Sequence, residues 1–221
     1  MIKTIIFDFD GTLADTQQTI VETAQATLEA LNLPPISPDI LRPLIGLPLR
    51  ETFVRLVGQS AKEQLFDECV AVYHRLFEEK AEQSIRLFPN VKETLEQLHK
   101  QHITLTIASS RGHLSLSSLA HRLELSPLLS LILGEDDVIN KKPAPDMVLE
   151  TLRRTATSAE EALVVGDTTY DLAMGQGAGC RTVGVTYGNH SRQQLETQHP
   201  RFIIDDFSQL QRIVMEENRG S

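Results

Sequence analysis

Cysteine is scarce in this sequence, and its scarcity excludes common kinds of metal site. The two cysteines, Cys69 and Cys180, lie far apart and form no C-x-x-C pair, and no histidine cluster stands near them. This spacing argues against structural zinc and predicts two buried free thiols. Aromatic residues reach only 5%, no basic run accompanies them, and the net charge is -9. A nucleic-acid partner is therefore not expected.

Long hydrophobic runs are also missing. A membrane-spanning helix needs about 18 consecutive apolar residues, and the sequence has no such run. The first residues, MIKTI, enter an apolar segment without the charged and cleavage-site regions of a secretory signal. We therefore expect a cytoplasmic protein with no membrane partner, as a monomer or a weak homodimer. With 221 residues, of which 41% are hydrophobic and 23% charged, the chain can form a sizeable globular core.

Short β-branched apolar runs recur along the chain and alternate with helical patterns. Runs of this kind are typical of strands that are buried on both faces of a sheet. They occupy residues 2–7, 103–108, 131–133, 162–165, 181–185 and 202–204. The alternation of strands and helices predicts a parallel sheet with helices on both faces.

One connection is far longer than a parallel crossover requires. Residues 12–102 separate the first two apolar runs, although about a dozen residues suffice for such a crossover. Apolar residues recur at helical spacing within this surplus, at Ile20, Ala24, Leu28, Leu31, Leu65, Val72 and Leu76. We therefore predict a helical domain at residues 16–83, inserted into an α/β core that is formed by residues 1–15 and 84–221.

Two carboxylates end the first apolar run. Asp8 and Asp10 are separated by one residue, and on an extended strand they would lie on one side, roughly 7 Å apart. Paired carboxylates are costly without a cation or a proton between them, and a phosphoryl group with a divalent metal fits this gap. Gly11 permits an abrupt turn after the pair. An acidic hairpin end on a solvated edge is the alternative that this pair alone leaves open.

Polar side chains end three further runs, and in open parallel sheets such ends gather at one edge. Ser109 and Ser110 follow the second run and offer hydroxyl donors for phosphate oxygens, or simply cap a helix. Lys142 follows the third run in a segment fixed by prolines and can neutralise a phosphoryl group. Asp167 and Asp171 follow the fourth run, and carboxylate oxygens are the ligands that magnesium prefers.

These motifs occur in a fixed order: D-x-D-G-T at residues 8–12, serine at 109, lysine before proline at 142–143, and G-D-x-x-x-D at 166–171. The ordered set resembles the haloacid dehalogenase superfamily. The resemblance covers almost the whole chain, because one subclass of that superfamily also inserts a helical cap after the first motif. It implies an α/β fold with a Rossmann-like parallel sheet core, helices on both faces and an inserted α-helical cap domain.

The resemblance also implies roles for these residues. Asp8 would attack phosphorus and become an aspartyl phosphate, while Asp10 would protonate the leaving oxygen and later activate water. Ser109 and Lys142 would bind the phosphoryl oxygens. The cofactor would be Mg²⁺, bound by the Asp8 carboxylate, the Asp10 backbone carbonyl and Asp167, with Asp171 in support.

Two segments indicate which subgroup of the superfamily the chain resembles. Residues 44–49 in the expected cap and residues 184–188 after the fifth run look like those of phosphoglycolate phosphatase relatives. We take as candidate substrate-binding residues Gly46 in the first segment, Arg50, which flanks that segment, and Ser110 in the second motif. Arg50 carries a guanidinium fork that suits a carboxylate or a second phosphate. A solvated helix charge is the alternative for this arginine.

Asp10 and Ile20 discriminate among the reactions of the superfamily. Carbon–halogen cleavage needs no acid at position 10, so dehalogenation is disfavoured, and sugar phosphomutases with this cap carry a histidine where this chain has Ile20. We therefore predict a phosphoric monoester hydrolase, a magnesium-dependent phosphatase for small phosphorylated metabolites. Pyrophosphatase and sugar phosphomutase are the alternatives among enzymes. A regulatory protein that binds a phosphorylated ligand without turnover is the alternative outside them.

Overall fold

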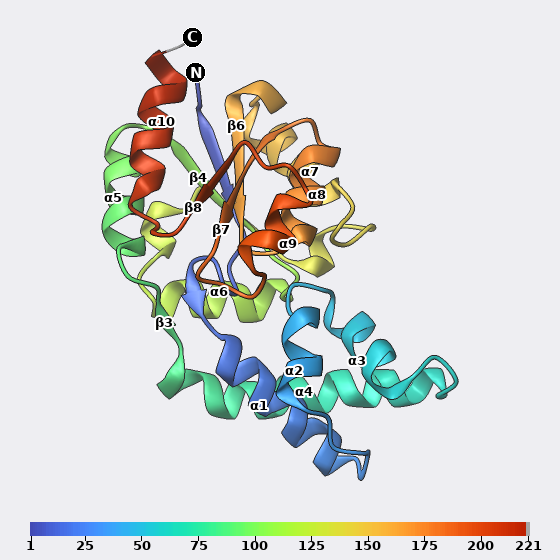
Figure 1. Ribbon diagram of the computed structural model, residues 1–221. Coiled ribbons are helices and arrows are strands. Elements are labelled where there is room, and N and C mark those ends of the chain that lie inside the picture. The colour runs from blue at the N-terminus through green and yellow to red at the C-terminus, as the bar shows by residue number, and fades with distance from the viewer. Residues whose placement is uncertain (220–221) are drawn as a thin grey trace.

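A six-stranded parallel sheet forms the centre of the computed structural model (Figure 1). The structure describes residues 1–219, apart from the side chains of residues 80–83. The strand order is β5-β4-β1-β6-β7-β8. The strands are β1 (Thr4–Phe7), β4 (Thr104–Ala108), β5 (Leu131–Leu133), β6 (Ala162–Gly166), β7 (Arg181–Val185) and β8 (Phe202–Ile204). They coincide with the six apolar runs of the sequence, so the predicted parallel sheet is confirmed.

Helices cover both faces of this sheet (Figure 1). They are α5 (Val91–Lys100), α6 (His113–Arg122), α7 (Asp146–Thr155), α8 (Thr169–Gly177), α9 (Arg192–Glu196) and α10 (Gln209–Arg219). Ile5 and Phe7 of β1 pack in a cluster with residues of α5, α6 and α10, whereas Ile6 packs in a second cluster with residues of α7 and α8. Because β1 is buried on both faces, its sequence is an unbroken apolar run.

A separate helical layer lies beyond the carboxyl ends of the strands (Figure 1). It contains α1 (Gln17–Ala30), α2 (Pro38–Leu41), α3 (Leu49–Val57) and α4 (Glu63–Ser84). The chain enters and leaves this layer through an antiparallel ribbon of β2 (Ala14–Asp15) and β3 (Arg86–Leu87), which the sequence patterns do not predict. The domain boundary expected at residue 83 stays a prediction, and the side chain at that position lies outside the described residues.

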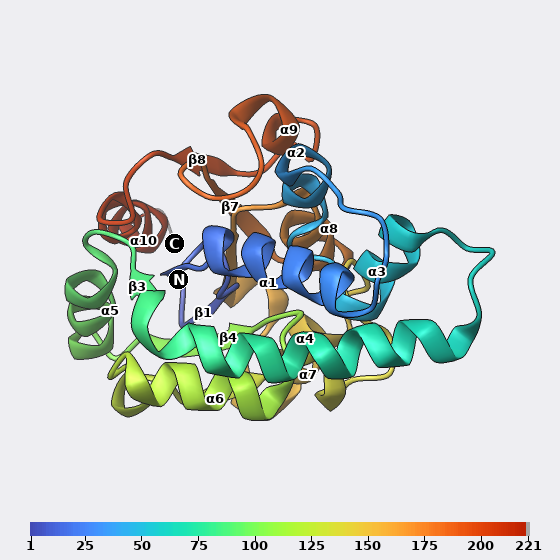
Figure 2. The same cartoon turned by 90° about the horizontal axis from the view of Figure 1, so that it is seen from below.

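Helices α1 and α4 lie side by side (Figure 2). The buried stripe of α1 includes Ala24 and Leu28, as the helical spacing predicts, together with Val21. The predicted Ile20 and Leu31 are half-buried. The buried stripe of α4 is Phe66, Cys69, Tyr73 and Phe77. The sequence pattern places that stripe one residue away, on the half-buried Leu65, Val72 and Leu76. Aromatic side chains bury more surface than leucine or valine, so they take the inner positions.

Both cysteines are buried free thiols, as predicted. Burial raises the pKa of the Cys180 thiol to about 11, so this thiol stays protonated and contributes to packing. Within the described residues, no helix is both long enough and apolar enough to cross a bilayer.

Candidate active site

The carboxyl ends of β4, β1 and β6 meet at the edge of the sheet that faces the helical layer (Figure 1). Because β1 stands between β4 and β6, the residue that follows it, Asp8, lies between Ser109 after β4 and Asp167 after β6. All three side chains are buried. The structure thus brings Asp8 together with two residues that lie more than a hundred positions after it in the chain.

The spacing of Asp8 and Asp10 predicts that they lie on one side of an extended strand, but in the structure neither belongs to the strand. Strand β1 ends at Phe7, and the chain turns at Gly11, whose φ of 96° lies in the left-handed region that favours glycine. The turn gives the two carboxylates different partners. Asp8 points into the buried site, whereas Asp10 is only partly buried and faces Arg111.

Lys142 connects Asp8 to Asp171. The side chain of Lys142 is fully buried, and its Nζ lies 2.6 Å from Oδ1 of Asp8 and 2.7 Å from Oδ1 of Asp171. Burial works against the charged ammonium, but the charges of Asp171 and Asp8 outweigh burial and raise the pKa of Lys142. A positive charge is therefore held permanently between the two carboxylates.

Three buried carboxylates form a candidate metal site. Asp8, Asp167 and Asp171 each place an oxygen within 4.8 Å of the others. Burial and then the charge of Asp171 raise the pKa of Asp167 to about 7. Burial also raises the pKa of Asp8 well above its usual value, although Lys142 opposes the shift. A single lysine leaves surplus negative charge in this group, so a divalent cation that prefers oxygen ligands fits it.

Asp167 is held by hydrogen bonds on both oxygens. Its Oδ1 accepts from the Thr12 hydroxyl at 2.9 Å, and its Oδ2 accepts from the backbone N–H and the side-chain amide of Asn189 at 2.7 and 2.8 Å. The same Asn189 amide donates to the Asp10 carbonyl at 3.3 Å. A Cβ at Gly11 would lie 2.3 Å from an Asp167 oxygen, so only glycine fits there. The motifs do not identify Asn189, although its place after the end of β7 is a usable signal.

Asp171 has both of its oxygens engaged. Oδ1 accepts from Lys142, and Oδ2 accepts from the backbone N–H and the hydroxyl of Thr168 at 2.9 and 2.7 Å. Thr168 and Asp171 cap the start of α8 reciprocally. Asp171 therefore holds Lys142 in place beside Asp8.

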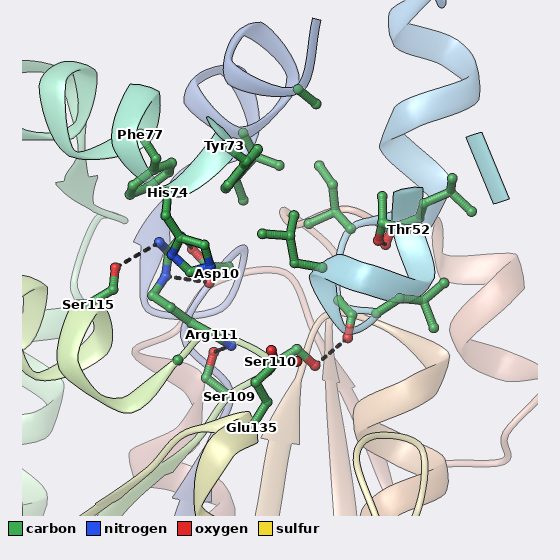
Figure 3. A pocket seen from close by; sticks show the side chains of 18 of the residues that line it. Asp10, Thr52, Tyr73, His74, Phe77, Ser109, Ser110, Arg111, Ser115 and Glu135 are labelled. Carbon is green, nitrogen blue, oxygen red and sulfur yellow. Dashed lines mark hydrogen bonds and ion pairs between the residues drawn. The ribbon is translucent and has the colours of Figure 1, made fainter. Parts of the chain in front are cut away.

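Asp10 is paired with Arg111, to which the sequence motifs assign no role. The Arg111 Nη2 lies 2.6 Å from Oδ1 of Asp10, and Nε lies 3.1 Å from Oδ2 (Figure 3). The guanidinium also lies 4.3 Å from the centroid of the Phe77 ring on α4 and donates to the Ser115 hydroxyl at 3.3 Å. Arg111 therefore connects the Asp10 carboxylate to the helical layer.

Ser109 and Ser110 have different environments. Ser109 is buried, and its Oγ accepts a hydrogen bond from the backbone N–H of Arg111 at 3.2 Å. The Ser110 hydroxyl donates to the carbonyl of Gly46 at 2.7 Å. Gly46 has a φ of 100° and belongs to the helical layer, so this layer reaches the strand ends at the position expected from the sequence.

Arg50 is not brought to the site. It lies on α3 with its side chain 42% exposed and forms ion pairs with Glu63 and Asp67. It is absent from the described residues that line the pocket next to the carboxylates. The position of Arg50 therefore favours a surface charge over substrate binding.

A pocket separates the strand ends from the helical layer (Figure 3). It contains about 900 Å³ of empty space, with the open solvent at its mouth included. Asp8, Asp10, Ser109 and Ser110 line one side, and residues of α1, α3 and α4 line the other. A small molecule bound here would lie between the carboxylates and the helical layer.

Comparison with known proteins identifies relatives along nearly the whole chain. A protein named probable phosphatase IndB from Dickeya dadantii is 35% identical over 93% of this chain and 90% of the relative. A phosphoglycolate phosphatase from Photorhabdus laumondii is 31% identical over 95% of this chain and 91% of the relative. The pyrophosphatase PpaX of Bacillus anthracis is 28% identical over 99% of both chains.

A solved structure and a family model also match this chain. The crystal structure of a predicted phosphoglycolate phosphatase from Haemophilus somnus matches with a TM-score of 0.88 and 27% identity, over 96% of this chain and 98% of the other. A family model described as haloacid dehalogenase-like hydrolase matches residues 5–185. The resemblance seen in the sequence is thus confirmed, and the chain belongs to the haloacid dehalogenase-like hydrolase family.

Proposed function

We propose that this protein is a magnesium-dependent phosphatase that hydrolyses small phosphomonoesters through an aspartyl phosphate on Asp8. The position of Asp8 carries the proposal: it is buried at the end of β1, paired with Lys142, and grouped with the carboxylates of Asp167 and Asp171. Membership of the family, together with relatives named as phosphatases, makes the chain a phosphoric monoester hydrolase.

Asp8 supplies the nucleophilic oxygen in this proposal. Its carboxylate forms a bond to phosphorus as the bond from phosphorus to the ester oxygen breaks, which leaves the phosphoryl group on Asp8. Water then attacks phosphorus, and release of inorganic phosphate regenerates the carboxylate. Lys142 holds a positive charge beside Asp8 and offsets the negative charge of the transferring group. Ser109, buried at the end of the neighbouring strand, supplies a hydroxyl for a phosphoryl oxygen.

Mg²⁺ would be held by Asp8, Asp167 and the Asp10 backbone carbonyl, with Asp171 in support. When bound, the ion supplies positive charge against the phosphoryl oxygens. Asn189 donates both to Asp167 and to the Asp10 carbonyl, so it fixes two of these oxygens relative to each other. Such hydrogen bonds to the ligands orient a metal site before the ion enters it.

Removal of divalent metal tests this function. We expect protein treated with EDTA to release phosphate from p-nitrophenyl phosphate at least about 100-fold more slowly than protein in millimolar Mg²⁺, because several kcal/mol of charge stabilisation is lost. Added Mg²⁺ should restore the rate, and circular dichroism should show the same fold throughout. Equal rates with and without metal would contradict the metal site. No turnover of a broad ester panel in Mg²⁺ would favour a regulatory protein that binds a phosphorylated ligand.

Asp10 is proposed as the proton carrier between the leaving oxygen and the attacking water. In the structure both of its oxygens accept hydrogen bonds from Arg111. An acid has to present its O–H to the leaving oxygen, and each Asp10 oxygen has a second lone pair that can carry this proton while Arg111 stays bound. Arg111 also contacts Phe77 of α4, so the position of the helical layer bears on the position of Asp10.

The effect of replacing Asp10 with asparagine should depend on the leaving group. An alkoxide needs a proton as it leaves, whereas p-nitrophenolate leaves without one. We expect Asp10→Asn to lower kcat/KM for an alkyl phosphate by about 100- to 1,000-fold and kcat/KM for p-nitrophenyl phosphate by clearly less. This ratio reports the steps up to loss of the leaving group, so the later attack of water, which both esters share, does not enter it. Steady-state kinetics with both esters on one preparation measure the difference. Equal losses on the two esters would contradict the acid role.

Residues 16–83 are proposed as a cap that covers the substrate. The Ser110 hydroxyl contacts the Gly46 carbonyl, and the Gln17 amide donates to the Asn189 side chain at 3.0 Å. Both hydrogen bonds join this segment to loops at the strand ends. A cap in this place restrains water while the aspartyl phosphate exists.

A pyrophosphatase is the second candidate, because one relative has that name. The substrate would then carry a second phosphate in place of a carbon leaving group. A sugar phosphomutase is disfavoured further by the pocket, since the side chain that lines it at position 20 is isoleucine. Isoleucine cannot transfer a proton to a sugar hydroxyl.

A further inference from the structure

We propose that the group esterified to phosphate in the substrate is uncharged and largely apolar, such as an alkyl or aryl group. It would carry neither a carboxylate nor a second phosphate. This inference rests on the proposed phosphatase function and deepens it by naming the class of substrate. It comes from the side of the pocket that the helical layer forms.

Apolar side chains make up most of that side of the pocket. They come from α1, α3, α4 and the segment between α2 and α3, and include Ile20, Leu44, Leu49, Phe53, Tyr73 and Phe77. Figure 3 shows Tyr73 and Phe77 facing the pocket from α4, on the side opposite Ser109 and Ser110. The leaving group of a phosphate bound at Asp8 would extend toward these side chains. Burial of apolar atoms there favours an apolar leaving group.

Positive charge is scarce in the pocket. Among the described residues that line it, Arg111 has the one guanidinium, and no lysine is present. Arg111 already binds both oxygens of Asp10 and stacks on Phe77. His74 is the remaining basic group, and burial and the charge of Arg111 lower its pKa from its ordinary value, which favours the neutral imidazole. A carboxylate on the substrate would have to compete with Asp10 for Arg111.

Negative charge lines the pocket beyond the catalytic carboxylates. Glu78 and Glu135 both contribute to the lining. The arginines nearest in sequence to the expected substrate-binding segment, Arg42 and Arg50, pair with exposed carboxylates and do not line the pocket. A second anion on the substrate would thus meet these carboxylates, with Glu135 paired to Lys141 and no unpaired cation among the described lining residues, which disfavours its binding.

A matched set of esters tests the inference on the unmodified protein in Mg²⁺. From ethyl to butyl phosphate we expect kcat/KM to rise about fourfold per methylene, the factor that burial of one methylene supplies. The kcat/KM for propyl phosphate should exceed that for phosphoglycolate, which is similar in size, by at least about tenfold. The kcat/KM for pyrophosphate should be as low as that for phosphoglycolate. A flat dependence on chain length, or a preference for phosphoglycolate or pyrophosphate over propyl phosphate, would overturn the inference.

A charge introduced at Thr52 gives a second test. Thr52 lines the apolar side of the pocket (Figure 3), and its hydroxyl donates only within its own segment, to the Pro48 carbonyl at 3.3 Å and the Leu44 carbonyl at 3.5 Å. Thr52→Lys should raise the ratio of kcat/KM for phosphoglycolate to that for propyl phosphate by at least about tenfold. Thr52→Met, uncharged and of similar length, should not raise it. An unchanged ratio in a folded Thr52→Lys protein would overturn the inference.

Failure of the inference and failure of the proposed function give different results. If p-nitrophenyl phosphate and every other ester are inert in Mg²⁺, the phosphatase proposal itself is wrong. If p-nitrophenyl phosphate is hydrolysed but kcat/KM is higher for phosphoglycolate or pyrophosphate than for propyl phosphate, the phosphatase proposal stands. The inference of an apolar leaving group is then wrong. Should Thr52→Lys fail to fold by circular dichroism, the ester series on the unmodified protein decides alone.

Discussion

Replacement of Asp8 with asparagine is expected to slow phosphate release about ten-thousand-fold or more, the scale of loss when a catalytic nucleophile is removed. The amide lacks the charged oxygen that would attack phosphorus, so no phosphoryl group can be transferred to the side chain. Because the substitution also removes one of three crowded carboxylates, we expect the melting temperature to stay the same or rise. Phosphate release from p-nitrophenyl phosphate and thermal unfolding measure the two effects.

Asp15 provides the matched control for this substitution. It lies on β2, is exposed, and stands seven residues beyond Asp8 in the chain. Asp15→Asn should keep the rate within about twofold, as exposed substitutions usually do. An Asp8→Asn protein that retained about a tenth of the unmodified rate would have lost far too little for a nucleophile, and Asp8 would need another role.

Replacement of Lys142 with methionine is expected to lower both activity and stability. Loss of one partner from a buried charge pair leaves the others uncompensated and costs about 3–5 kcal/mol, and Lys142 has two such partners in Asp8 and Asp171. We expect kcat to fall about 100- to 1,000-fold, since a fixed charge beside the transferring group is lost. Thermal unfolding and steady-state kinetics on the same preparation measure both changes.

A double variant separates the two roles of Lys142. In Lys142→Met with Asp171→Asn, one of the uncompensated carboxylates is removed, so much of the lost stability should return. The rate should stay low, because the ammonium charge of the lysine beside Asp8 is still missing. A double variant that regained both stability and activity would show that Lys142 acts on the fold alone. Unchanged kcat in Lys142→Met would contradict its proposed role directly.

Most of the sheet can be predicted from the sequence because its strands are buried on both faces. Such strands are nearly unbroken apolar runs, and their ends are marked by the first polar residue. In a parallel sheet these ends share one edge, which is why Asp8, Ser109 and Asp167 lie together in the structure. The position of each follows from the local pattern, whereas the chemical role of each stays a prediction.

Features that depend on packing between distant segments could not be predicted in the same way. The ion pair of Asp10 and Arg111 joins residues that follow different strands, and no local pattern signals it. The ribbon of β2 and β3 has two residues in each strand, too few for an alternating pattern to be recognised. Arg50 pairs with carboxylates of α4, including that of Asp67, and does not line the pocket. Its own neighbours in sequence carry no sign of this.

The stereochemical course at phosphorus tests most directly whether Asp8 carries the phosphoryl group. A phosphorothioate monoester made chiral with oxygen isotopes and hydrolysed in isotopically labelled water reports the configuration of the product. Two in-line displacements, the first by Asp8 and the second by water, predict net retention of configuration. Net inversion would mean that water attacks the substrate directly, and it would contradict the aspartyl phosphate.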